Sequence, residues 1–299
     1  MDLILLRQAL ADIYPDAELT DCDRLEGGVS ADVYRIDFRV AGKDIAPVVL
    51  RCHGDSHGGH AAQLEYELLK ALYEAGLPVP QPLLVDDSCG VLSDPFLVIG
   101  FMAGSAKFPA AELPARVPRL AQALAQIHNA RPCNLPTLPQ RLDPLPELFE
   151  FMPEGEEWQD LIAYLRTLEK TSYTGPQCLL HGDYWPENIL WQDGDISAVL
   201  DWEDAALGDP LSDVAAARVE LRYLHGSDVM EQFSNAYAEY APVDTNRLAL
   251  WQIYVAAAAH CYMGHWGLAP EREAHMRREA LASMREAAAQ LMASPSETE

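Results

Sequence analysis

Three oxygen-bearing side chains in the middle of the chain, Asp183, Asn188 and Asp201, are spaced so that they could act together. Carboxylate and amide oxygens are hard ligands that suit Mg²⁺, which proteins usually hold with one or two side chains plus substrate phosphates. A carboxylate that stays off the metal can instead accept a proton, because a metal-bound carboxylate is too acidic for that task. We therefore expect Asn188 and Asp201 to be metal ligands and Asp183 to be a general base.

The element expected to position these side chains is a β-hairpin. Asp193-Gly194 lies between two short apolar runs, and this dipeptide so flanked is the strongest short-range hairpin signal, because both turn residues take positive φ. Counting outward from a two-residue turn places Asn188 opposite Val199. Asp201 would then be a diagonal neighbour of Asn188, about 7–8 Å away at the α-carbons.

The spacing Asp-x-x-x-x-Asn, followed by a hairpin that ends in Asp, matches a kinase catalytic centre. In such a centre one Asp orients and deprotonates the acceptor hydroxyl, the Asn holds a metal ion, and the second Asp bridges the metal to the phosphates. The competing interpretation is a polar loop and hairpin that only hold two core strands. The occurrence of further motif pieces in the right order argues against it.

These pieces resemble a known family. His181-Gly182-Asp183 with Asn188 is followed by Asp201-Trp202-Glu203 and then by Gly208-Asp209-Pro210, as in the aminoglycoside phosphotransferase (choline kinase-like) family, whose members have the protein-kinase-like fold. The resemblance implies a two-lobed α+β protein. Its small N-lobe, an antiparallel sheet plus a helix, would span residues 1–102, and its larger, mostly helical C-lobe residues 103–299.

The resemblance also implies ATP-dependent transfer of the γ-phosphate to a hydroxyl of a small molecule, such as an aminoglycoside-like compound, another amino alcohol or a sugar. ATP and Mg²⁺ would be the cofactors. Asp183, His181 and Asn188 would be the catalytic residues, and Asp209 would support the catalytic loop by hydrogen bonds, with Asp213 in a similar role. Two alternatives stay open: a non-catalytic nucleotide-binding protein on the same fold, and a metal-dependent hydrolase of phosphate esters.

Nucleotide-binding features are expected before residue 102. Gly27-Gly28 and Ser30 precede an alternating strand at residues 34–40 and resemble the family's nucleotide-binding loop, in which glycine lets backbone N–H groups approach phosphate. A strand at 47–50 leads to Arg51, where kinases carry a Lys that contacts the phosphates. Arg is always charged and can clamp phosphate bidentately, so the role could survive.

A helix at residues 61–75 places Glu65 on its apolar edge. A buried acid needs a partner, and Arg51 is the candidate. Strands at 78–85 and 96–99 follow. The segment from Gly100 to Gly104 would be the hinge between lobes, where the backbone at Phe101 and Met102 could receive adenine.

The rest of the chain is predicted to be mainly helical. A helix ending at His128, which is expected to be a packed structural histidine, leads into an irregular connector at 131–153 that holds six prolines. Helices are predicted at 154–170, 210–224, 228–241, 244–264 and 271–292, after one at 3–14 at the N-terminus. The resemblance suggests an acidic substrate patch comprising Glu154, Glu157, Asp160 and Glu203.

The composition is acidic, with 46 Asp and Glu against 21 Lys and Arg and a formal net charge of −25. Nucleic acid and anionic membranes are therefore poor partners. The charge would attract a cationic acceptor, but a generally acidic, soluble surface explains it without any substrate and is favoured because the acids are spread along the chain.

No apolar run of membrane-spanning length occurs, and the first residues lack the features of a secretion signal, which favours a cytoplasmic protein. The six scattered cysteines are expected to be reduced and mostly buried. His53, His57 and His60 lie in a glycine-rich segment that is expected to be a mobile polar loop rather than a metal site.

Overall fold

The structure is a computed structural model of the chain, and it describes residues 3–11, 13–25, 31–54 and 58–293. By packing, the chain forms two compact units. The first comprises residues 1–105, 131–137 and 189–204, and the second comprises residues 106–130, 138–188 and 205–299. The hairpin region 189–204 thus packs with the N-terminal unit, which a division at residue 102 does not anticipate.

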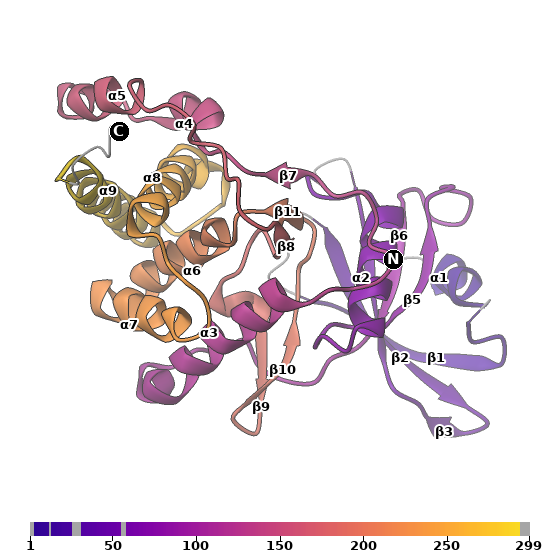
Figure 1. Cartoon of the computed structure of the whole chain (residues 1–299). Helices are drawn as coiled ribbons and strands as arrows, with labels where there is room; N and C mark the ends of the chain where they lie inside the picture. Colours follow the sequence, from indigo (N-terminus) through magenta and orange to yellow (C-terminus); the bar gives the residue numbers. More distant parts are fainter. Residues whose placement is uncertain (1–2, 12, 26–30, 55–57, 294–299) are drawn as a thin grey trace. The chain divides into compact units, whose positions relative to one another are not determined.

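The first unit is built on an antiparallel sheet with strand order β1-β2-β4-β6-β5 and with β3 beside β2 (Figure 1). Two helices accompany the sheet, and α2 packs against β5 and β6. The elements are α1 (Leu3–Leu10), β1 (Ala17–Arg24), β2 (Asp32–Val40), β3 (Lys43–Asp44), β4 (Val48–Cys52), α2 (Ala62–Glu74), β5 (Pro82–Asp86) and β6 (Phe96–Gly100).

Alternation along β4 decides which side chains face which helix. Leu50 and Cys52 join the apolar residues of α1 in one core cluster. Arg51 lies between them in sequence, so its side chain points to the opposite face, where it contacts Glu65 of α2. The expected pairing of Arg51 with Glu65 is therefore confirmed.

The first unit also contains a hairpin formed by β9 (Ile189–Gln192) and β10 (Asp195–Val199). Asp193 and Gly194 have φ values of 51° and 84°, so the turn is of the predicted kind. The predicted register is confirmed next to the turn, where Gln192 pairs with Asp195 and Trp191 with Ile196, but it is wrong farther out, because the pairing shifts between Ile196 and Ala198 and Val199 pairs with Ile189. A bulge adds one residue to a single strand, and the turn residues do not encode it.

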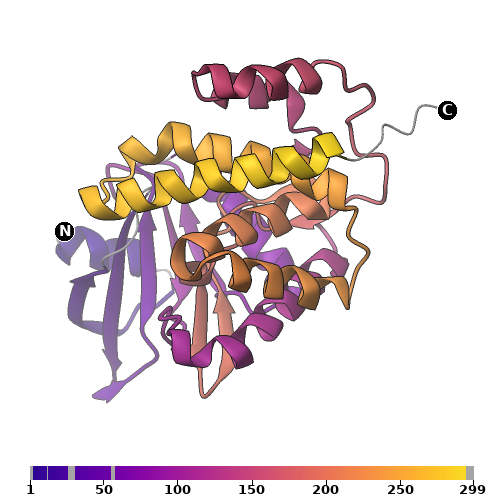
Figure 2. The same ribbon diagram turned by 90° about the vertical axis from the view of Figure 1, so that its left-hand side faces the viewer.

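The second unit is mostly helical and includes a small sheet of order β7-β11-β8. Its main apolar core lies among α4, α5, α6, α8 and α9, and Figure 2 shows α8 and α9 side by side. The elements are η1 (Ala110–Glu112), α3 (Leu113–Asn129), β7 (Gln140–Arg141), α4 (Leu145–Phe151), η2 (Glu156–Trp158), α5 (Gln159–Leu165), β8 (Cys178–Leu180), η3 (Pro186–Asn188), β11 (Ala206–Gly208), α6 (Pro210–His225), α7 (Ser227–Ala238), α8 (Thr245–Tyr262), η4 (Met263–His265) and α9 (Pro270–Ala293).

Several sequence predictions need correction. The first helix ends at Leu10, the strand β1 was not predicted, and the segment 154–170 forms only the short elements η2 and α5. The connector 131–153 contains β7 and α4. Pro144 precedes α4 and Pro146 lies in its first turn, a position where the missing N–H of proline costs no helical hydrogen bond.

The cysteines differ in exposure. All six are free thiols; Cys52 and Cys178 are buried, whereas Cys89, Cys133 and Cys261 are exposed, so the expectation of mostly buried thiols is wrong. Within the described ranges, no helix combines the length and the apolar character needed to cross a membrane.

Candidate active site

The loop His181-Gly182-Asp183 directly follows β8 and is held by hydrogen bonds to its backbone. The carboxylate of Asp213 on α6 accepts one from the N–H of His181 at 2.7 Å and one from the N–H of Gly182 at 3.0 Å. Arg141 donates to the carbonyl of Gly182 at 3.0 Å. Gly182 has a φ of 89°, which suits glycine. The loop is therefore fixed from both sides.

Asp213 is itself fully buried in a polar network. Nε2 of His128 lies 3.2 Å from its carboxylate, and Nδ1 of His128 lies 2.7 Å from the hydroxyl of Tyr237. Burial alone raises the pKa of Asp213, but the hydrogen bond and charge of His128, with the charges of His181 and Arg141, outweigh burial and lower that pKa. His128 is buried, as expected for a structural histidine.

Asn188 orients Asp183. Its Nδ2 donates to the backbone carbonyl of Asp183 at 2.9 Å and to the carboxylate Oδ2 at 3.1 Å. Because the amide nitrogen faces Asp183, the amide oxygen is directed elsewhere, and no hydrogen bond from the described residues engages it. His181 is completely buried and packs edge-on against Tyr184, so it supports the loop from inside.

Glu220 adds a carboxyl group that the sequence analysis missed. Burial raises the pKa of Glu220 to about 8, and the negative charges of Asp183 and Glu187 act in the same direction, whereas Arg272 opposes them. Glu220 follows Asp213 by two helical turns and so lies on the same face of α6. That spacing is the signal that could have identified it.

Asp209 has different partners from those expected. Its buried carboxylate accepts hydrogen bonds from the backbone N–H of Leu211 at 3.0 Å and from Nε1 of Trp251 at 2.6 Å, and it pairs with Arg247. The prediction that Asp209 supports the catalytic loop by hydrogen bonds is therefore wrong. Asp209 caps the N-terminus of α6, whereas Asp213, one turn later, faces the loop.

In the first unit, Arg51 is surrounded by three carboxylates. Nη1 lies 3.4 Å from Oε1 of Glu65, and Nη2 lies 3.0 Å from both Oδ1 of Asp201 and Oε2 of Glu203. Burial opposes the charge of Arg51, but the three carboxylates outweigh it and raise the pKa of the guanidinium. Asp201 adopts a left-handed backbone with a φ of 64°. Glu203, which was predicted to contact substrate, contacts Arg51, and its role toward a substrate stays a prediction.

His53 belongs to the same cluster. It is 6% exposed, and its Nε2 lies 3.2 Å from Oε2 of Glu65, so the expectation of a mobile polar loop is wrong for this residue. The backbone N–H of His60 donates to the carbonyl of Glu203 at 2.9 Å. His57 lies outside the described residues.

Only some of the remaining residues that were predicted to bind nucleotide lie in the described part of the structure. Gly27, Gly28 and Ser30 lie outside the described residues. The N–H of Phe101 donates to the carbonyl of Pro47 at 3.2 Å, and the guanidinium of Arg35 lies 4.7 Å from the centre of its ring. Because that N–H is engaged, any backbone donor for adenine in this segment would come from Met102 or beyond.

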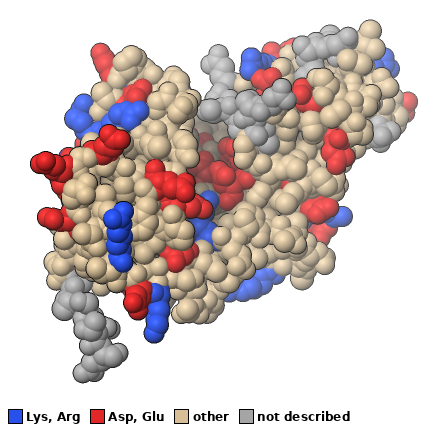
Figure 3. Space-filling model, turned by 90° about the horizontal axis from the view of Figure 1, so that it is seen from above, with Lys and Arg blue, Asp and Glu red and all other residues tan. Residues whose placement is uncertain are grey.

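The predicted substrate patch is an exposed acidic surface. Glu154, Glu157 and Asp160 are exposed, and Glu157 pairs with Arg285 of α9 at 3.0 Å. Acidic side chains also occur at several separate places on the face in Figure 3, with Lys and Arg side chains between them. Because the acidic side chains on this face are spread out, they agree with the interpretation of a generally acidic surface.

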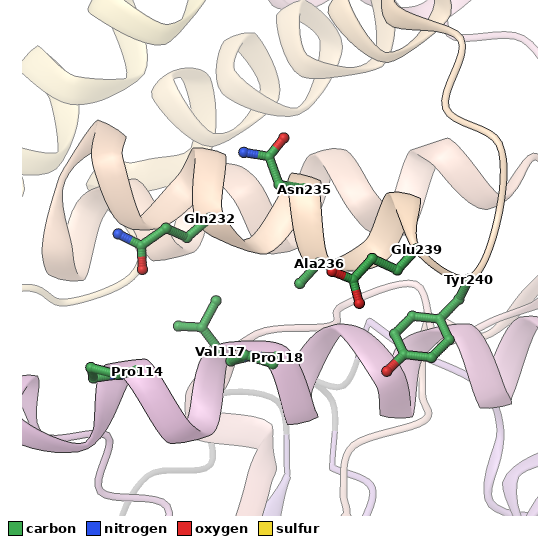
Figure 4. Close-up of a pocket in the computed structure, with 8 residues that line it drawn as sticks. All are labelled: Pro114, Val117, Pro118, Gln232, Asn235, Ala236, Glu239 and Tyr240. Atoms are coloured by element: carbon green, nitrogen blue, oxygen red, sulfur yellow. The ribbon is translucent and has the colours of Figure 1, made fainter.

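A groove of about 280 Å³ lies between α3 and α7 (Figure 4). Pro114, Val117 and Pro118 form one side of it, and polar residues of α7 such as Gln232 and Asn235 form the other. None of its lining residues is among those predicted to do chemistry.

Comparison with protein families identifies a match over most of the chain. A family model described as "Phosphotransferase enzyme family" matches residues 21–251. Mouse acyl-CoA dehydrogenase family member 10 is 26% identical over 175 residues, which are 52% of this chain and 16% of the mouse protein. Viomycin phosphotransferase of Streptomyces vinaceus is 27% identical over 177 residues, which are 50% of this chain and 59% of that enzyme. The chain thus spans less than two thirds of these relatives.

Solved structures with the same fold cover nearly the whole chain. A putative aminoglycoside phosphotransferase from Ralstonia eutropha has a TM-score of 0.69 at 16% identity and covers 97% of this chain and 98% of its own. A mutant of aminoglycoside phosphotransferase APH(4)-Ia in a ternary complex with ADP and hygromycin B has a TM-score of 0.63 at 18% identity, covering 94% and 98%. Choline kinase LicA of Streptococcus pneumoniae has a TM-score of 0.63 at 16% identity, covering 95% and 99%. The expected protein-kinase-like α+β fold is thereby confirmed.

Proposed function

This chain belongs to the phosphotransferase enzyme family, and from that premise we propose that it is a kinase that transfers the γ-phosphate of ATP to a hydroxyl group of a small molecule. The observation that carries the proposal is the support of Asp183. Asn188 donates a hydrogen bond to the carboxylate of Asp183. Asp213 accepts hydrogen bonds from the backbone of the two residues that precede Asp183 in the chain. A carboxylate held in this way is suited to orient a hydroxyl and to accept its proton.

The oxygen atoms of two side chains of this protein are ligands of the kind that Mg²⁺ prefers. The amide oxygen of Asn188 is turned away from Asp183, and Asp201 contributes a carboxylate whose side chain is 34% exposed. These two residues would hold the ion. When bound, Mg²⁺ would neutralise charge on the phosphates. Asp183 would remain off the metal and retain its basicity.

Arg51 is the proposed phosphate contact. Its guanidinium is anchored at Glu65 and carries a permanent charge. Because Arg presents several donors in one plane, it can keep a carboxylate and also donate to a phosphate oxygen. The replacement of the usual Lys is therefore compatible with nucleotide binding.

The acceptor is proposed to be an amino alcohol, an aminoglycoside-like compound or a sugar, and the place of action the cytoplasm. Hygromycin B is bound in the APH(4)-Ia complex, and another structural neighbour is a choline kinase. The negative charges of Asp183 and Glu187, which both act on Glu220, would favour an acceptor that carries a positive charge. Nucleic acid and membranes are not proposed as partners.

ADP formation with Mg²⁺-ATP across a panel of aminoglycosides, choline, amino alcohols and sugars tests the proposal. We expect turnover with at least one acceptor and its loss in Asp183→Asn, which removes the base without changing the side-chain volume. Asp193→Asn is the matched control, because Asp193 lies exposed in the hairpin turn, where Asn also accepts positive φ. Normal turnover by Asp183→Asn would exclude Asp183 as the base.

A non-catalytic nucleotide-binding protein is the second candidate. The three carboxylates around Arg51 favour it, because they could hold the guanidinium away from reacting phosphates. It predicts tight binding of ATP with no ADP formation on any acceptor.

A further inference from the structure

We infer that a surface formed by Glu147, Phe151, Tyr254 and Tyr262, called here the aromatic–acid patch, binds a substituted ammonium group, and that the acceptor is an alcohol that carries such a group. The inference deepens the proposed kinase function and rests on it, because it selects one chemical class of acceptor.

Three rings from two helices form the apolar part of the patch. The ring centre of Phe151, at the end of α4, lies 5.8 Å from that of Tyr254 and 5.5 Å from that of Tyr262, both on α8. Phe151 and Tyr254 are half-buried, whereas Tyr262 is 49% exposed. The three rings therefore pack edge to face against one another and remain partly open to solvent.

No cation of the chain covers these rings. Phe149, in the same helix α4, has the guanidinium of Arg166 at 5.8 Å from its ring centre. Within the described ranges, no basic side chain lies over the ring of Phe151, Tyr254 or Tyr262 in this way. Because the faces of aromatic rings attract cations, the patch can accept a positive charge from a ligand.

Glu147 supplies a negative charge beside the rings. Its Oε2 accepts a hydrogen bond from the hydroxyl of Tyr254 at 2.6 Å. Burial, this hydrogen bond and the charge of Glu147 raise the pKa of Tyr254, so the hydroxyl stays a neutral donor. The carboxylate is exposed, and no Lys, Arg or His of the described residues pairs with it. Its charge is therefore available to a cationic ligand.

The patch lies beside the residues that hold the catalytic loop, all of them in the second unit. The ring of Trp251 packs against that of Tyr254 at 5.5 Å and donates from Nε1 to Asp209 at 2.6 Å. The backbone N–H of Asp209 donates to the carbonyl of Arg141 at 3.0 Å, and Arg141 donates to the carbonyl of Gly182 at 3.0 Å. A ligand on the patch would thus lie near the loop that carries the proposed base.

The chemistry of the patch fits one alkylated ammonium group best. A neutral sugar gains no attraction from the carboxylate. The primary ammonium groups of an aminoglycoside each carry three N–H donors and need hydrogen-bond acceptors, which ring faces do not supply. A substituted ammonium group has few or no N–H donors and presents alkyl groups, which suit ring faces.

Tetramethylammonium tests the patch without requiring turnover, by NMR titration of its methyl signal with the full chain. We expect Glu147→Gln, which keeps an acceptor for Tyr254, and Tyr262→Leu, which removes an aromatic face, each to raise the Kd about fivefold. Tyr262→Phe keeps the face and should preserve binding. Glu150→Gln in α4 and Tyr73→Leu in α2 are matched controls, because they replace exposed residues outside the patch and should leave the Kd unchanged.

Steady-state kinetics links the patch to the acceptor. Choline and longer trimethylammonium alcohols are compared with their carbon isosteres, in which a tert-butyl group replaces the trimethylammonium group. The two series differ in charge but hardly in shape. We expect the KM of an ammonium alcohol to be at least about tenfold lower than that of its isostere, and the ratio to shrink in Glu147→Gln. Tetramethylammonium should compete with the acceptor.

The results separate the inference from the proposed function. ADP formation with a sugar or an aminoglycoside but with no ammonium alcohol, or a Kd for tetramethylammonium that the patch substitutions do not change, would overturn the inference and leave the kinase proposal intact. Loss of self-association in the patch variants would show that a second copy covers the patch, and would overturn it as well. If tetramethylammonium bound through Glu147 and Tyr262 but no acceptor gave ADP, the kinase proposal would fail, and with it the assignment of the patch to an acceptor.

Discussion

The carboxylate of Asp213 lies 2.7 Å from the backbone nitrogen of His181, a residue that precedes it by 32 positions in the chain. The same side chain also accepts a hydrogen bond from Gly182. The first turn of α6 therefore sets the position of the loop that carries Asp183. The proposed base is placed by a buried anion, and the charge of that anion matters because its partners are two backbone N–H donors.

Asp213→Asn should reduce catalysis more than nucleotide binding. An Asn offers one acceptor oxygen, and its NH₂ group would face one of the two N–H donors. We expect kcat to fall by about 10–100-fold, as small displacements of catalytic groups commonly cause, with KM for ATP within about twofold. Steady-state kinetics at saturating acceptor measures both. An unchanged kcat would show that the loop keeps its position without the carboxylate.

Arg247→Ala should destabilise the protein strongly. It leaves the carboxylate of Asp209 fully buried without its cation, and it also removes hydrogen bonds of 2.6 and 2.7 Å to the carbonyls of Thr171 and Leu142. Breaking a buried pair from one side typically costs about 3–5 kcal/mol. Urea denaturation followed by tryptophan fluorescence would measure the change in the free energy of unfolding.

Arg285→Ala is the control for that measurement. Arg285 pairs with Glu157 at 3.0 Å, but the two side chains are 50% and 53% exposed. Exposed pairs contribute about 0–1 kcal/mol because water and salt screen them. If the two variants lost the same free energy of unfolding, the burial of Asp209 could not be the cause of the loss in Arg247→Ala.

Gly208→Ala should disrupt the small sheet behind the catalytic loop. A Cβ at Gly208 would lie 2.0 Å from the carbonyl oxygen of Arg141, and β11 pairs with both β7 and β8. The strand must move, so we expect a loss of roughly 3 kcal/mol or more, the range of severe steric substitutions. Gly58→Ala, where a Cβ meets no atom within 4 Å, is the control in the same denaturation assay. Equal stability of the two variants would contradict the prediction.

The sequence identified the elements better than their exact pairing. The Asp193-Gly194 turn was predictable because its chemistry is local, but the bulge between Ile196 and Ala198 moved Val199 opposite Ile189. Nothing in either strand marks that extra residue. Asn188 consequently lies in η3 rather than in the hairpin.

The same limit applies to side-chain partners. The periodicity of α2 was sufficient to pair Glu65 with Arg51, because both residues lie in regular elements with known faces. The pairing of Glu203 with Arg51, by contrast, was not predicted. Residues after the hairpin follow no period, so their direction depends on the left-handed turn at Asp201, which the residue type did not indicate.

Glu220→Gln should make the protein more stable at alkaline pH and should have little effect in acid. Burial, with the charges of Asp183 and Glu187, raises the pKa of Glu220 from 4.5 to about 8 in the folded protein. Between these values the folded state holds a proton that the unfolded chain has lost, so the stability that Glu220 contributes falls as pH rises through this range. Gln remains neutral at every pH.

The melting temperature of both proteins should therefore be compared from pH 4 to pH 9. We expect the two curves to meet near pH 4 and to separate progressively as pH rises through the range between the two pKa values, with the variant melting at the higher temperature at pH 9. Parallel curves would mean that Glu220 ionises normally in the folded state.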